Sequence, residues 1–119
     1  MARLKKPEAA LAARVLGEVG FEHRLVGYRL GPRTGPMAVP MYSLKEVVNL
    51  LAGPHPRMDL GALADWVAEA LGDEDLAQAM RAALKKGKHN EDRTRRVHDL
   101  MALRLDQCRR QTGAPAEVS

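Results

Sequence analysis

The feature that most constrains the fold is a helix start signal at Ser43-Leu44-Lys45-Glu46. In such a capping box the serine hydroxyl accepts a hydrogen bond from the backbone N–H three residues on, and the glutamate reaches back toward the cap. Tyr42 and Val47 flank the box and can form a hydrophobic staple. The apolar residues that follow share one helical face, and Gly53-Pro54 ends the pattern. A helix is therefore predicted from this box to Gly53.

Three further helices are predicted in the second half of the chain, over residues 59–71, 73–86 and 90–112. Apolar residues recur in each of them at the three- and four-residue spacing of one helical face. Each begins at a residue type that caps helix N-termini and ends at a glycine. The predicted caps are Asp59, Asp73 and Asn90, and the predicted terminators are Gly72, Gly87 and Gly113.

The first 42 residues predict one helix followed by a small β-hairpin. Proline suits a first helical position, so the helix is placed from about Pro7 to the glycines at 17 and 20. Residues 21–30 and 37–42 are rich in β-branched, aromatic and apolar residues, and the Gly/Pro segment 31–36 between them predicts a turn. Pro40 cannot donate to a sheet ladder, which places its strand at an edge.

These elements predict a mainly α fold, a bundle of about five helices with a small β-hairpin between the first two. The chain of 119 residues is 45% hydrophobic and 29% charged, which is typical of one ordinary globular domain. Aromatic residues make up only 3%, so Leu, Val, Ala and Met must fill the core. We expect a single helical domain over residues 1–113 and a flexible tail over 114–119.

Cysteine content and hydropathy predict a cytoplasmic protein. The single cysteine, Cys108, cannot form an intramolecular disulfide. No stretch approaches the ~20 apolar residues that span a bilayer, and the start lacks the apolar core of a signal peptide. Arg outnumbers Lys thirteen to six in an Ala- and Leu-rich chain, which indicates a GC-rich bacterial genome.

Two segments of the chain resemble a family of small, uncharacterised prokaryotic helical domains. They are Ser43-Leu44-Lys45-Glu46 and the run from Trp66 through Leu71-Gly72-Asp73-Glu74-Asp75-Leu76-Ala77. The resemblance covers about residues 28–80. The family's Asp-Phe pair before the tryptophan is replaced here by Ala62 and Leu63. The resemblance implies an extended segment, a Ser-Leu-x-Glu helix and a helix pair, and it brings no activity with it.

No catalytic, cofactor-binding or metal-ligating residue is predicted. Zinc sites need three or four ligands with close local spacing, which the histidines at 23, 55, 89 and 98 do not offer, and His55 between two prolines reads as a loop residue. Asp65 and Glu69 lie opposite the apolar stripe of their helix, so they are expected in solvent and not in a catalytic cleft. The Gly/Pro turn lacks the Gly-Lys-Ser/Thr ending of a phosphate loop. A small enzyme stays open as a third class, because a missing motif is weak evidence.

The favoured prediction is a non-catalytic module that docks to a protein partner, including another copy of itself. The net charge of +4 is segregated, with −6 over residues 58–80 and +6 over 81–110, and such segregation can be neutralised inside the fold or between copies. Trp66 lies off the apolar stripe of its helix, so either a second helix face is buried or the indole contacts a partner. The candidate partner contacts are Trp66, Arg93, Arg95, Arg96 and Arg104.

The alternative is a nucleic-acid-binding protein that uses the basic region 81–110. Its last three helices could form a helix-turn-helix-like trio with the longest as the reading helix. Glu91 and Asp92 in the first turn of that helix oppose this reading, as do several i,i+4 ion pairs that already support a solvated helix. The candidate phosphate contacts are Lys85, Lys86, Lys88, Arg93 and Arg96.

Overall fold

The fold is mainly α, with five helices and a small antiparallel hairpin between the first two, as predicted. The structure is a computed structural model that describes residues 4–31, 33, 35–53 and 56–112. The predicted tail 114–119, the predicted helix end at Gly113 and the loop residue His55 lie outside these residues. The elements are α1 (Ala9–Leu16), a 3-10 turn η1 (Phe21–His23), β1 (Leu25–Gly31), β2 (Gly35–Met41), α2 (Leu44–Ala52), β3 (Pro56–Arg57), α3 (Leu60–Glu69), α4 (Glu74–Lys86) and α5 (Asn90–Thr112).

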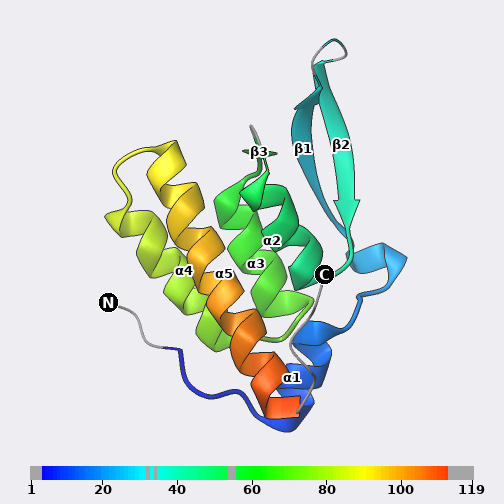
Figure 1. Ribbon diagram of the computed structural model, residues 1–119, viewed down its shortest axis with the longest axis vertical. Coiled ribbons are helices and arrows are strands. Elements are labelled where there is room, and N and C mark those ends of the chain that lie inside the picture. The colour runs from blue at the N-terminus through cyan, green and yellow to red at the C-terminus, as the bar shows by residue number, and fades with distance from the viewer. Residues whose placement is uncertain (1–3, 32, 34, 54–55, 113–119) are drawn as a thin grey trace.

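The helices form one body from which the hairpin projects (Figure 1). The long helix α5 runs across the body and packs against α1, α2 and α4, while α3 packs on α4. The fully buried side chains of these helices make a single core. Its largest apolar members include Leu44, Leu50, Leu63, Leu71, Leu76, Met80 and Met101. No helix within the described ranges is both long and apolar enough to cross a membrane.

Three of the predicted helix caps are confirmed as hydrogen bonds. The side chains of Ser43, Asp59 and Asp73 each accept from the backbone N–H three residues on, at 3.3, 3.0 and 3.2 Å. The fourth prediction is wrong by one residue, because Asn90 is the first residue of α5 and His89 occupies the cap. There Nδ1 of His89 accepts from the N–H of Asp92 at 3.2 Å.

The hairpin begins later than predicted, and a third strand joins it. Phe21–His23 form a 3-10 turn, and strand β1 begins only at Leu25. A third strand, the two-residue β3, pairs with β1 and gives the order β2-β1-β3, which the short Pro-Arg segment did not predict. Gly27 lets β1 lie against α2, because a Cβ atom there would come within 2.7 Å of Leu50 and Met58.

Trp66 is buried, with 8% of its surface exposed. Its indole Nε1–H donates to the carbonyl oxygen of His23 at 2.6 Å, so the 3-10 turn covers a second face of α3. The sequence left two readings open for this side chain, and the buried face is the one that the fold adopts. The prediction that Trp66 contacts a partner is therefore wrong in this fold, because a hydrogen-bonded indole inside the core cannot reach a partner.

Arg104 is also buried, with 1% of its surface exposed, and its prediction as a partner contact is likewise wrong. Its Nε and Nη2 atoms donate to the two carboxylate oxygens of Asp73 at 2.7 and 2.9 Å. Its Nη1 atom donates to the carbonyl oxygen of Lys5 at 2.6 Å and to Oε1 of Gln107 at 3.0 Å. The guanidinium thus joins α4, α5 and the extended segment before α1.

The same network holds the segment before α1, which begins at Ala9, two residues after the predicted start at Pro7. The segment before it is held extended through its backbone, since the N–H of Lys5 donates to Asp75 at 2.8 Å and its carbonyl accepts from Arg104. Gln107 donates to the carbonyl oxygen of Leu4 at 3.3 Å. These bonds fix the backbone of residues 4–5 against Asp75 of α4 and against Arg104 and Gln107 of α5.

Candidate interaction surface

The predicted cationic side chains are brought together at the corner where α4 ends and α5 begins. Three of them, Arg93, Arg95 and Arg96, are exposed on the first turns of α5. The lysines at 85, 86 and 88 are exposed at the end of α4 and in the connection that follows. Carboxylates share this corner. Asp92 accepts from Arg96 Nε at 3.0 Å and from the N–H of Lys88 at 3.1 Å, and these hydrogen bonds lower the pKa of its carboxyl group.

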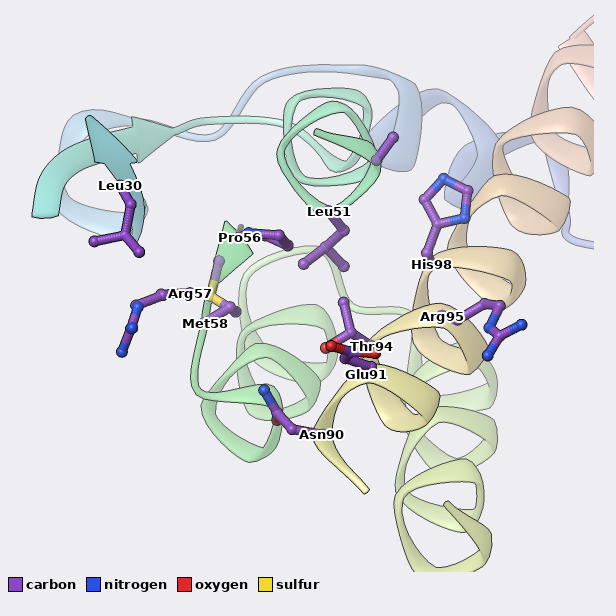
Figure 2. A pocket seen from close by; sticks show the side chains of 11 residues that line it. Leu30, Leu51, Pro56, Arg57, Met58, Asn90, Glu91, Thr94, Arg95 and His98 are labelled. Carbon is purple, nitrogen blue, oxygen red and sulfur yellow. The ribbon is translucent and has the colours of Figure 1, made fainter. Parts of the chain in front are cut away.

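An open cleft of about 760 Å³ lies beside this corner (Figure 2). One wall is the first two turns of α5, where the polar side chains of Glu91, Thr94 and His98 lie on one side of the helix. The opposite wall is apolar and comes from the end of α2 and from the segment containing β3. Its described members are Leu51, Ala52, Pro56 and Met58, with Leu30 of β1 and Arg57 at one end.

The lining of this cleft combines an apolar wall with hydrogen-bonding groups. Thr94 supplies a hydroxyl, and His98 has its Nδ1 atom 3.0 Å from Oδ1 of Asp99, which orients the ring. No group of three potential metal ligands occurs among the residues that the structure describes. One apolar wall facing one hydrogen-bonding wall suits an amphipathic group, such as a side chain of another protein.

The outer face of the hairpin is apolar throughout. The strand register sets Val26 opposite Pro40, Tyr28 opposite Ala38, and Leu30 opposite Pro36. These six residues alternate along the two strands and therefore share one face; we call them the hairpin surface. Tyr28 is 46% and Val26 38% exposed, and the three residues on β2 are exposed as well. The solvent-facing side of an antiparallel sheet is usually polar, so this face is unusual for solvent.

The surroundings of the hairpin surface are cationic. Between His23 and Lys45 the chain contains no acidic residue but carries Arg24, Arg29 and Arg33. The guanidinium of Arg24 stacks over the exposed ring of Phe21, 3.9 Å from its centroid. Leu30 belongs both to the hairpin surface and to the cleft, so the two form one continuous region.

Sequence reasoning missed this region, although a signal for half of it was present. Once residues 25–31 and 35–41 are aligned as a hairpin, one face is seen to be wholly apolar while the other carries Arg29, and only one of them can lie on the helices. The cleft gave no such signal, because β1, α2, β3 and α5 meet only in the folded chain.

The thiol of Cys108 is excluded from reactive chemistry by its burial. The side chain is fully buried in α5, and burial raises its pKa from 9.0 to about 11 despite the nearby Arg104.

Since thiolate is the reactive form, we expect the native thiol of Cys108 to react with Ellman's reagent at pH 8 about a hundredfold more slowly than the thiol of the urea-unfolded chain. The rate of absorbance increase measures this, and equal rates would contradict it. Because the unfolded chain ionises this thiol more readily than the fold does, the group leaves the stability of the fold undiminished below pH 9. The free energy of unfolding falls as the pH rises from 9 toward 11.

Comparison with known proteins places the chain in no established group. No family model matches it, and neither the curated proteins nor the solved structures contain a match. The resemblance of residues 28–80 to a prokaryotic helical family stays a prediction.

Proposed function

We propose that this protein is a non-catalytic interaction module that docks to a protein partner through the hairpin surface. The observation that carries the proposal is the outer face of a projecting hairpin whose six residues are all apolar and largely exposed. Exposed contiguous apolar surface marks a binding site on a soluble protein. The bacterial cytoplasm is the proposed setting, which agrees with a lone buried thiol and an Arg-rich composition.

The chemistry of the region supports one kind of partner for this proposal. An apolar protein surface bordered by carboxylates would complement both the hairpin surface and the arginines around it. A side chain of the same partner would fill the cleft, with its apolar part against Leu51 and Met58 and its polar end toward Thr94 and Glu91. Anchors of this kind in a pocket supply most of the binding free energy of an interface.

Nucleic-acid binding is the second candidate, supported by the exposed cations at the α4–α5 corner. The carboxylates of Glu91 and Asp92 share that corner, and one of them is already paired with Arg96. They would face the phosphates and weaken binding. Nucleic-acid binding would also leave the apolar hairpin surface without a role, which is why we favour a protein partner.

A matched pair of variants tests the proposal. Val26→Asp/Tyr28→Asp places two carboxylates on the hairpin surface, and Met37→Asp places one on the opposite face of the same hairpin, where Met37 is 54% exposed. A partner is captured from bacterial extract, purified and titrated by calorimetry. We expect the double variant to bind about thirtyfold or more weakly, as for the loss of a hot-spot tyrosine, and Met37→Asp to bind like the natural chain.

Two results would overturn this function. One is a purified partner that binds the double variant as tightly as the natural chain. The other is a chain that retains only nucleic acid, released steeply as salt rises and lost when Arg93 and Arg96 are changed to Glu. That second result would promote the nucleic-acid candidate in its place.

A further inference from the structure

The exposed side of α5 carries a regular stripe of charge. Six residues recur along it at alternating spacings of four and three, which keeps them on one side of a helix. They are Asp92, Arg96, Asp99, Leu103, Asp106 and Arg110. All but Asp92, which is half-buried, are exposed, and the opposite side of the helix, including Val97 and Met101, lies in the core.

A shallow apolar hollow of about 490 Å³ accompanies this stripe between α4 and α5. Its α4 side consists of the small residues Ala79, Ala82 and Ala83. Leu100 and Leu103 form its α5 side, and Leu103 is 47% exposed. The face thus presents an exposed leucine at the edge of a mainly apolar hollow that is large enough to take an apolar side chain.

The order of charges along the stripe is its own complement in an antiparallel copy. Two antiparallel copies of α5 that meet with residue 99 opposite residue 103 also bring residue 96 opposite 106 and residue 92 opposite 110. Arg96 then faces Asp106 of the second copy, and Asp92 faces Arg110. The two-fold axis repeats both pairs, so four opposite-charge pairs form. A parallel copy in register would set like charges against each other at every charged position.

Within one chain these charges are already in two short pairs. Arg96 Nε lies 3.0 Å from Asp92, and Arg110 Nη2 lies 3.0 Å from Asp106. Both pairs face the solvent, and each joins two residues that are one helical turn apart. An antiparallel copy would set the pair 92–96 against the pair 106–110 with opposite signs in contact, which makes a network of four charges at each end of the centre, where Leu103 of each copy meets residue 99 of the other.

We propose that the chain forms a two-fold symmetric dimer through this α4–α5 face, with the α5 helices antiparallel and Leu103 at the hollow. A second copy is the occupant because the stripe matches itself in sign and spacing. This assembly goes beyond the docking function, since it leaves both hairpin surfaces outside the interface and presents two of them to a partner.

Charge reversal in separate chains tests the dimer independently of effects within one chain. We expect the natural protein to show twice its 13.1 kDa mass in sedimentation equilibrium. Arg96→Glu and Asp106→Lys each create two like-charge contacts in their own homodimer, so each should dissociate about tenfold or more readily. Mixed together they restore opposite charges at both contacts, so the mixture should return to the dimer mass.

Leu103→Asp tests the contact of Leu103 with the hollow, with Val26→Asp/Tyr28→Asp as the control on the other surface. The first should shift the mass toward one chain, and the second should leave it unchanged, while circular dichroism checks that both variants are folded. The proposal is overturned by a natural protein that stays monomeric at about 1 mM, where even weak complexes form. It is also overturned by a dimer that Leu103→Asp does not weaken, or by a charge-reversed mixture without heterodimer. Each of these results leaves the hairpin-docking proposal standing, because that proposal depends on a different face.

Discussion

Replacing Arg104 with methionine is expected to lower the free energy of unfolding by about 3–5 kcal/mol, because it leaves the Asp73 carboxylate buried without its counter-charge. Both side chains are almost fully enclosed, and two hydrogen bonds of 2.7 and 2.9 Å join them. Methionine fills a similar volume, so the loss reports the charge pair more than a cavity. Urea denaturation followed by circular dichroism measures it.

The control is the double variant Arg104→Met/Asp73→Ser. Serine can still cap α4 through its hydroxyl, as Asp73 does toward the N–H of Leu76, while it removes the buried charge. We expect the double variant to recover most of the stability that the single variant loses, since removing both members of a buried pair is often close to neutral. If adding Asp73→Ser lowers the free energy of unfolding by as much again as Arg104→Met alone does, the buried-charge explanation is wrong.

The same substitution should loosen the segment before α1. Arg104 donates to the carbonyl oxygen of Lys5, and Gln107, which holds Leu4, is itself a partner of Arg104. Without the guanidinium this segment keeps the bond from Lys5 N–H to Asp75 and loses a second anchor. Cleavage by trypsin after Lys5 and Lys6 is therefore expected to accelerate under native conditions.

Local chemistry explains which parts of the fold were predictable. A helix cap depends on residues three apart, so Ser43, Asp59 and Asp73 were recognisable from the sequence and are confirmed. The partner of Asp73, however, lies 31 residues away in α5. Arg104 occupies a position of the apolar stripe, since it follows Val97 and Met101 at helical spacing. Its spacing is therefore that of a buried position, yet its charge led to the prediction of a partner contact, and nothing in the sequence identified the carboxylate that would meet it.

The candidate site was hidden for a similar reason. The cleft needs the end of α2, the short β3 and the first turns of α5 at once, and each is unremarkable alone. The hairpin surface was closer to prediction, because alternation and the turn segment already defined the strands. The sequence did not show which face of the hairpin would lie on α2. In the fold it is the face that contains Gly27, where the absence of a side chain lets β1 approach Leu50 of α2.

Trp66→Ala is expected to cost about 3–5 kcal/mol of unfolding free energy, the range for removing a buried aromatic side chain. The indole packs in the core and ties α3 to the turn at residues 21–23 through its bond to the carbonyl oxygen of His23. Trp66 is the only tryptophan, so circular dichroism must replace fluorescence as the probe of unfolding.

Trp66→Phe separates the packing of the ring from its hydrogen bond. It retains an aromatic ring but removes the N–H donor, and it should cost less than Trp66→Ala by about 2 kcal/mol, since a smaller cavity remains. Amide exchange at Phe21–His23 should rise in both variants, because the carbonyl of His23 loses its donor in each. A partner-contact role for Trp66 predicts the opposite result, with unchanged stability and unchanged exchange in the free protein. The 2.6 Å bond across 43 residues of sequence is the reason to expect that the indole holds the turn on the helix body, and thereby the base of the hairpin that follows it.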